Sequence, residues 1–185
     1  MALPERKPVQ SPRSDASLIA DIRGGNAEAI GTLYERHGKS LLALAYRLLQ
    51  STADAEDVVH DVFVGLPEAL RRYEERGALT SWLRKITARV ALAKIREATA
   101  RNQVDVANVP DLAARQPDIE ATLSLEQAMR QLSPSLRAVL VLKEIEGFSH
   151  AEVASLLDIS IGASEVRLHR AVQALRTLLT QGEGQ

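Results

Sequence analysis

Residues 147–171, GFSHAEVASLLDISIGASEVRLHRA, contain two helix-like segments separated by a break too short to be a linker. Ser149 and Glu152 form the pattern S-x-x-E, a capping box, which predicts that the first helix begins at Ser149. Residues 158–160 interrupt that helix, and Ser160 can cap the next one. Two helices across so short a turn are typical of a helix-turn-helix, whose second helix docks in the major groove of DNA. An ordinary corner in a helical bundle fits the same pattern, so both interpretations stay open here.

The composition favours helix along the whole chain. Of the 185 residues, 45% are hydrophobic and only 3% are aromatic, so aliphatic side chains must build the core. A sequence rich in Ala, Leu, Arg and Glu favours helix, and no stretch shows strand-like alternation of useful length. We therefore expect an all-α protein.

The apolar periodicity predicts two small helical domains joined by a linker. Residues 101–118 lose the helical pattern and contain two prolines, which is typical of a linker. Pro67 is expected to kink or end the helix that opens at Ser51 or Thr52. The expected boundaries are 1–14 for a disordered tail, 15–100 for the first domain with its last helix running from about 80 to 100, 101–118 for the linker, and 119–181 for the second domain with the helix-turn-helix.

Targeting signals and cysteine chemistry are missing from the sequence. The chain contains no cysteine, which excludes disulfides and thiolate metal sites. The N-terminus lacks the apolar region of a secretion signal, and no stretch approaches the ~18 apolar residues of a membrane span. We expect a cytoplasmic protein that is not inserted in a membrane.

Charge is unevenly distributed, although the formal net charge is only −1. Near-neutrality argues against a nucleic-acid binder that acts alone, because such proteins are usually basic. Two segments differ in sign: the acidic residues are Asp54, Glu56, Asp57 and Asp61, and the basic ones are Arg84, Lys85, Arg89, Lys94, Arg96 and Arg101. At about 100° per residue, Lys85, Arg89 and Arg96 share one face of a helix. The pattern predicts two partners of opposite sign, or one assembly that carries both.

No catalytic or cofactor site can be assembled from this sequence. Asp57, His60 and Asp61 have a spacing that a metal could use, but no further His or Cys completes a ligand set. Serines lie at helix caps, and no nucleophile, base and orienting group come together. We expect no enzyme activity, no metal and no cofactor.

Residues 132–179 resemble region four of bacterial sigma factors. The matching features are Leu132, Pro134, Arg137, Glu146-Gly147, Ser149, Glu152, Val153-Ala154, Leu157, Ser160, Gly162 and Arg167-Leu168. Upstream, LIADIRGGNAEAIGTLYERHGKSLLALAYRLL and DAEDVVHDVFVGLPEAL resemble the first parts of region two, and RGALTSWLRKITARVALAKIR resembles its promoter-melting part. This order, with a short linker and little else, is that of the extracytoplasmic-function (ECF) sigma factors, and it covers nearly everything from Asp15 to Leu179.

The resemblance implies partners for both domains. Region two of such proteins grips a coiled coil of RNA polymerase, and the matching residues here are Asp54, Glu56, Asp57 and Asp61. The alternative for these acids is a solvated helix start that complements the helix dipole. The melting part implies that Trp82 stacks on an unpaired base of the minus-ten element, beside the phosphate-binding residues Arg84, Lys85, Arg89 and Arg96. Core packing is the alternative for Trp82.

Region four implies contacts with the minus-thirty-five element from Ser160, Arg167 and Arg170. Several positions depart from the family pattern: Glu165 replaces a common Lys, Ala163 a Thr, Arg89 an Asn and Ala93 an Asp, and Pro67 falls where the helix is usually uninterrupted. Ser164 is expected to face inward as a weak point in the packing. A carboxylate costs binding near phosphates but can accept from a cytosine amino group, so we expect an altered preference or weaker upstream binding.

Three hypotheses follow. The leading one is an ECF-type sigma factor that binds core RNA polymerase and promoter DNA; such modules are often held off by an anti-sigma protein. The second is a helix-turn-helix regulator that acts alone on duplex DNA. The third is a helical interaction module without promoter activity, for which Ala93, Ala163 and Glu165 are the warning signs.

Overall fold

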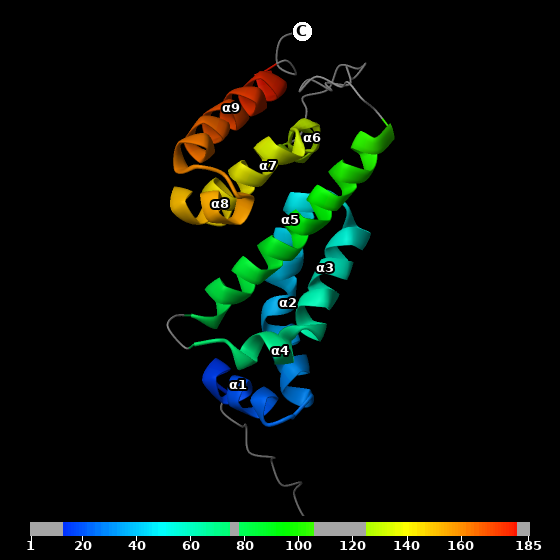
Figure 1. Cartoon of the computed structure of the whole chain (residues 1–185), viewed down its shortest axis with the longest axis vertical. Helices are drawn as coiled ribbons and strands as arrows, with labels where there is room; N and C mark the ends of the chain where they lie inside the picture. Colours follow the sequence, from blue (N-terminus) through cyan, green and yellow to red (C-terminus); the bar gives the residue numbers. More distant parts are fainter. Residues whose placement is uncertain (1–12, 75–77, 106–124, 181–185) are drawn as a thin grey trace, which may run out of the picture.

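The structure, a computed structural model, describes residues 13–74, 78–105 and 125–180, and every regular element in these ranges is helical. Figure 1 shows the helices in two groups, one above the other. The lower group contains α1 (Asp15–Arg23), α2 (Glu28–Leu49), α3 (Thr52–Val64), α4 (Leu66–Arg71) and α5 (Leu79–Asp105). The upper group contains α6 (Leu125–Gln131), α7 (Pro134–Leu140), the π-helical turn η1 (Val141–Ile145), α8 (His150–Leu157) and α9 (Ile161–Thr180). The prediction of an all-α protein is confirmed.

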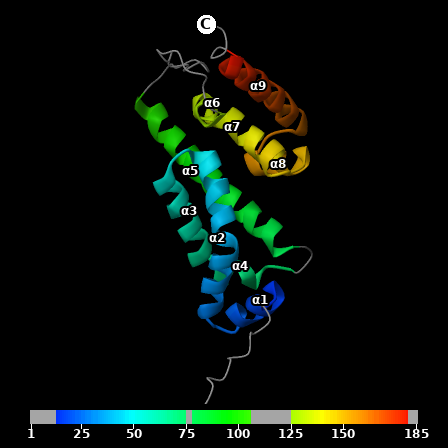
Figure 2. The same cartoon turned by 180° about the vertical axis from the view of Figure 1, so that it is seen from behind.

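The lower group is built around α2, which packs against α1, α3 and α5. Its apolar side is fully buried at Leu33, Leu41, Leu44 and Leu48. Figure 2 shows α2 lying along α5 with α3 beside them. Serines begin two of the helices: the Oγ of Ser51 accepts a hydrogen bond from the backbone N–H of Asp54 at 3.2 Å, and Ser14 caps α1.

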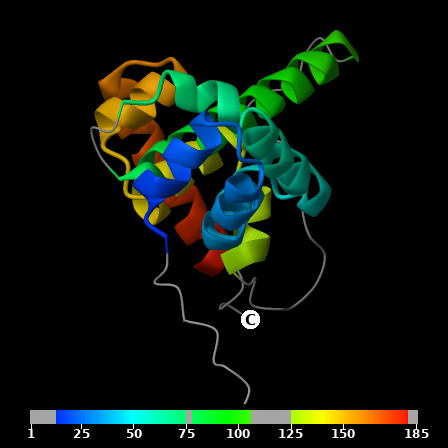
Figure 3. The same ribbon diagram turned by 90° about the horizontal axis from the view of Figure 1, so that it is seen from below.

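Two boundaries in the lower group differ from the sequence-based expectation. Pro67 does not interrupt α3, because α3 ends at Val64 and the proline sits in the first turn of α4, where a missing N–H costs nothing. The helix expected to stop near residue 100 runs on to Asp105 as α5. Its C-terminal turns extend beyond the rest of the bundle (Figure 3). The remainder of the expected linker, the start of the second domain and the expected tail up to residue 12 lie outside the described residues.

The upper group contains the helix-turn-helix, formed by α8 and α9. Ser149 and Glu152 make the predicted capping box, with both reciprocal hydrogen bonds present. Asp158 ends α8 in the left-handed region at φ 55°, and the Oγ of Ser160 accepts from the N–H of Ala163 at 3.1 Å. The helix-turn-helix geometry predicted from residues 147–171 is therefore formed.

The two groups are in contact. A single cluster of buried apolar residues includes members of both, and Phe148 is only 6% exposed. Arg137 of α7 is 7% exposed, and its guanidinium donates to the carbonyl of Leu48 in α2 at 3.1 Å. The upper group therefore lies against α2 and α5: α7 and η1 contact α2, and α8 of the helix-turn-helix contacts α5 (Figures 1 and 2).

Candidate nucleic-acid interface

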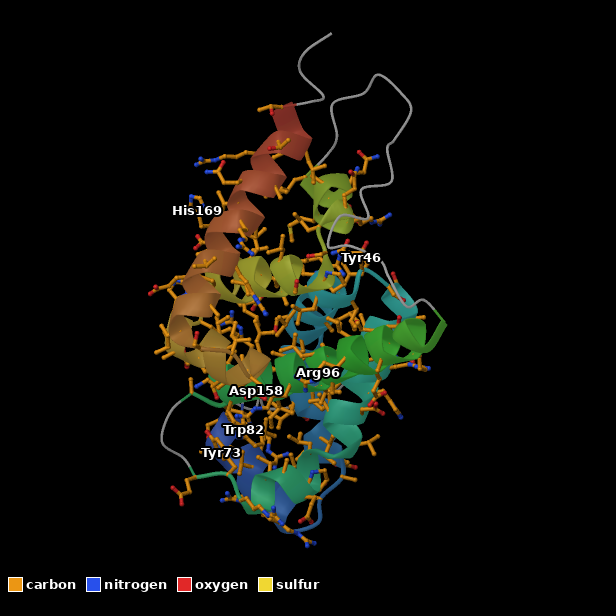
Figure 4. All side chains as sticks on the ribbon, turned by 45° about the horizontal axis from the view of Figure 1, so that its top comes forward. Tyr46, Tyr73, Trp82, Arg96, Asp158 and His169 are labelled. Carbon is orange, nitrogen blue, oxygen red and sulfur yellow. The ribbon has the colours of Figure 1, made fainter. Side chains whose placement is uncertain are left out.

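The outward side of α9 is an exposed stripe with mixed chemistry. Its exposed residues recur at helical spacing: Ile161, Gly162, Glu165, Val166, His169, Arg170 and Gln173. In Figure 4, His169 lies on the side of α9 that faces away from α7. The N-terminal half of such a helix is the part that reaches base edges in a groove. The second helix of the corner is thus open to a partner.

The inward side of α9 is anchored by a hydrogen bond between the two helices of the corner. Ser164 is fully buried, and its Oγ lies 2.9 Å from the Nδ1 of His150, the first residue of α8. Ser164 faces inward as expected, and His150 provides a hydrogen-bond partner for its hydroxyl there. Ser160 and Arg170 are exposed and Arg167 is half-buried, so these three predicted DNA contacts lie on or beside the open side of the corner.

On α5, Arg89 and Arg96 are exposed. In the part of the chain that the structure describes, no carboxylate lies within ion-pair distance of either guanidinium. Arg96 lies on the part of α5 that leads toward its projecting end (Figure 4). Two cations seven residues apart, or about two turns, can contact phosphates along one helix face.

Arg84 and Lys85, unlike Arg89 and Arg96, are already paired with carboxylates and are not free to contact phosphates. Arg84 donates through Nε to the carboxylate of Glu146 at 2.9 Å, and Lys85 Nζ lies 2.7 Å from the carboxylate of Glu152. Both carboxylates belong to the upper group. Neither pair is local in the sequence; both form because the upper group packs against the start of α5.

The acidic face of α3 is only partly engaged. Glu56, Asp57 and Asp61 are exposed, whereas Asp54 is half-buried. Lys94 of α5 reaches Asp54 at 2.8 Å and Asp57 at 2.9 Å. The hydrogen bond from this ammonium lowers the pKa of the Asp54 carboxyl, and Asp54 in turn raises the pKa of Lys94. The acidic and basic segments therefore neutralise each other in part, which the separation of charges in the sequence did not predict.

Trp82 is half-buried and packs against another ring. Its centroid lies 4.6 Å from that of Tyr73 with the ring planes tilted by 53°, and Figure 4 shows the two side by side. The contact gives the indole a structural role, in line with the alternative interpretation from the sequence. Its remaining exposed part can still meet a ligand from outside.

Within the described ranges, no group of three or more metal-binding side chains is placed to hold an ion. None of the helices described is long and apolar enough to cross a membrane.

Both parts of the chain match known families. Residues 33–101 match Sigma-70 region 2, and residues 122–175 match Sigma-70, region 4. The RNA polymerase sigma factor CarQ of Myxococcus xanthus is 31% identical over 167 residues, which cover 88% of this chain and 95% of CarQ. The ECF RNA polymerase sigma factor SigM of Mycobacterium tuberculosis (strain ATCC 25618 / H37Rv) is 29% identical, with 90% of this chain and 85% of SigM covered.

A solved structure agrees with these relatives. CnrH, in complex with the cytosolic domain of CnrY, has a TM-score of 0.56 at 29% identity, over 89% of this chain and 96% of that one. Two sigma modules in this order define a transcription initiation factor. The chain belongs to the ECF family of RNA polymerase sigma factors.

Glu152 gives the contact between the two groups a pH dependence. Its pKa is lowered from 4.5 to about 2, first by the hydrogen bond from Lys85 and then by the N–H and hydroxyl of Ser149. Because the folded pKa lies below the unfolded one, the stabilisation is complete above about pH 4.5 and is lost as the pH falls toward about 2. We expect Glu152→Gln, which keeps a capping acceptor, to be less stable than wild type at neutral pH.

The difference in unfolding free energy between wild type and Glu152→Gln should shrink steadily between about pH 4.5 and pH 2. Urea titrations followed by circular dichroism measure it. Glu144→Gln is the matched control, because Glu144 is exposed and unpaired within the described residues. A difference that stays constant with pH would show that the charge of Glu152 does not contribute.

Proposed function

We propose that this sigma factor docks on core RNA polymerase through α3, melts promoter DNA with α5 and reads the upstream element with α9. The observation that carries the proposal is the coexistence of an exposed acidic helix, an exposed cationic helix and an open helix-turn-helix on one chain. No observation favours a regulator that acts alone, or a module without promoter activity.

The polymerase contact is assigned to Glu56, Asp57 and Asp61, whose carboxylates are exposed on α3. A row of exposed acids complements a basic partner surface, which orients the complex and speeds association. Lys94 pairs with both Asp54 and Asp57, but only Asp54 is half-buried, so we assign Asp54 to fixing α3 against α5 as well as to docking.

The DNA contacts are divided between the two groups. Arg89 and Arg96 would bind the phosphates of the separated strand, and Ser160, Arg167 and Arg170 would bind the upstream duplex. Trp82 would stack on an unpaired base only with the part of its ring that Tyr73 does not cover. Arg84 and Lys85 would join the strand-binding face when their partners in the upper group are released.

A protein inhibitor is a further proposed partner. CnrH was solved with the cytosolic domain of another protein, CnrY, which supports the expectation of an anti-sigma protein here. We propose that the chain acts in the cytoplasm, where core RNA polymerase works, and that its sigma role requires no catalytic chemistry of its own.

Reconstitution tests the function. The protein is added to core polymerase, and run-off transcripts are scored from a library of upstream DNA with randomised minus-ten and minus-thirty-five segments. We expect binding to core polymerase and transcripts from a small promoter subset. Absence of both core polymerase binding and promoter-dependent transcripts would contradict the proposed function.

Glu165 is expected to set a base preference. Its carboxylate is exposed on the fifth residue of α9 and has no ion-pair partner among the described residues. A carboxylate there can accept from a cytosine amino group, and a good base contact is worth about 1–3 kcal/mol of discrimination. We therefore expect Glu165→Ala to lose a cytosine preference at one minus-thirty-five position in the selected library.

Gln173→Ala, two turns further along the same exposed stripe, is the control and should leave the selected sequences unchanged. If Glu165→Ala selects the same minus-thirty-five sequences as wild type, Glu165 does not contact a base.

A further inference from the structure

Glu146 is a carboxylate of the upper group buried between two arginines of the lower group. It follows η1 and precedes α8, and its side chain is only 7% exposed. Arg84 of α5 donates to it through Nε at 2.9 Å, and Arg47 of α2 donates through Nη1 at 3.1 Å. Arg84 also donates to the backbone carbonyl of Glu146 and lies 5.7 Å above the ring of Phe148. One residue thus ties the helix-turn-helix to two helices of the other group.

These contacts occupy half of the cations assigned to strand binding. Arg84 pairs with Glu146 and Lys85 with Glu152, whereas Arg89 and Arg96, further along α5, stay open. The Arg84 guanidinium cannot bind a phosphate without giving up its hydrogen bonds to this buried carboxylate, which would then keep Arg47 alone as its partner; breaking such a buried pair is costly. The arrangement seen here therefore offers only part of the face that would handle the separated strand.

The distance between promoter elements makes the same point. Under the proposed function α5 binds the minus-ten element and α9 the minus-thirty-five element, whose names mark positions about 25 base pairs apart, or roughly 85 Å of duplex at ~3.4 Å per pair. Here the start of α5 and the start of α8 touch, since Lys85 and Glu152 are 2.7 Å apart. Even α9, with 20 residues, spans only about 30 Å. The two groups must separate before α5 and α9 can reach both elements.

We propose that Glu146 is the latch of a closed, DNA-incompetent form of this protein, and that the Arg47–Glu146–Arg84 contact must break before the promoter is engaged. The inference that the closed form cannot engage a promoter rests on the proposed function, whereas the inference that Glu146 holds the two groups together does not. In the closed form the acids Glu56, Asp57 and Asp61 of α3 are still exposed, so core polymerase can dock first. Opening then releases Arg84 and Lys85 and lets the two groups move apart on the promoter.

The latch is tested by measuring the distance between the two groups in the full chain. Because the protein has no cysteine, Ala53→Cys and Gln173→Cys provide two unique spin-label sites, both exposed, on α3 and α9. We expect one dominant short-distance population in the labelled wild type. Glu146→Gln should increase the long-distance population about threefold or more, because neutralising the carboxylate weakens the closed state only.

Glu144→Gln is the matched control, since this exposed glutamate lies two residues earlier and makes no ion pair in the described ranges. A distance distribution for Glu146→Gln that equals that of Glu144→Gln overturns the proposal. So does a wild type without a short-distance population.

Arg47→Gln provides an independent arm from the other group, on a side chain that is 42% exposed and assigned to no DNA contact. It should also raise the open population, and the double variant Arg47→Gln/Glu146→Gln should open less than the product of the single effects, because both remove one pair. If Glu146→Gln fails to fold, Arg47→Gln decides the matter: a distance distribution equal to that of wild type overturns the proposed latch. Transcription assays test the proposed function separately. If the chain is inactive with polymerase but Glu146→Gln still increases the long-distance population, the proposed function is contradicted and the proposed latch is supported.

Discussion

Replacing Arg137 with leucine is expected to lower the free energy of unfolding by about 3 kcal/mol or more, because it leaves buried carbonyls without donors. The guanidinium donates to Leu48 and Leu132, each at 3.1 Å, and to Met129 at 3.5 Å. Burial lowers the pKa of this guanidinium, which records how little water reaches it. The bond to Leu48 belongs to the other helical group, so the substitution loosens both the turn after α6 and the contact with α2.

Chemical denaturation measures the effect of Arg137→Leu. Arg130→Leu is the matched control: Arg130 is exposed in α6 and bonds to Glu126 and to the hydroxyl of Tyr46, each at 2.9 Å, and exposed contacts of this kind contribute little to stability. Arg137→Lys should fall between the two, since one ammonium cannot reach all three carbonyls. Equal stability of Arg137→Leu and Arg130→Leu would mean that the carbonyls find other partners.

The second large effect concerns the open cations of α5. In holoenzyme, the double variant Arg89→Gln/Arg96→Gln should bind single-stranded minus-ten DNA about tenfold more weakly at low salt. The slope of log affinity against log salt should fall by about 1.4, because each single-strand phosphate contact contributes about 0.7. Fluorescence anisotropy at several salt concentrations gives both quantities.

Lys39→Gln/Arg176→Gln removes the same charge from exposed positions on α2 and α9 and should leave the slope unchanged. A reduced slope in both double variants would indicate a general effect of net charge, and no reduction in Arg89→Gln/Arg96→Gln would remove α5 from the strand-binding face.

The helices and their caps were predictable because their determinants are local. The capping box of Ser149 and Glu152 and the cap at Ser51 depend on side chains three residues apart, and both were found where the pattern indicated. The end of α5 was misjudged, because nothing between residues 101 and 105 forbids helix and no packing partner was needed to extend it.

The charge contacts were not predictable, since their partners are far apart in the chain. Lys94 meets Asp57 across 37 positions, Arg84 meets Glu146 across 62, and Arg47 meets Glu146 across 99. In the sequence, Glu146 and Arg137 served only to mark the family resemblance. No local signal indicates which of six basic residues on α5 face a carboxylate, because that depends on how the helix-turn-helix sits against α5.

The π-helical turn η1 sets the orientation of α8 and α9, the helices that follow it. Its wide ring is closed by the N–H of Glu146 bonding to the carbonyl of Val141 at 2.9 Å, and Phe148 bonds to Leu142 at 3.0 Å. Such a turn contains one residue more than an α-helical turn. Deleting that residue would swing the corner by about 100° around the axis of α7. The carboxylate could then no longer face Arg47 and Arg84, so chain length at this joint is as much a determinant of the closed form as the charges are.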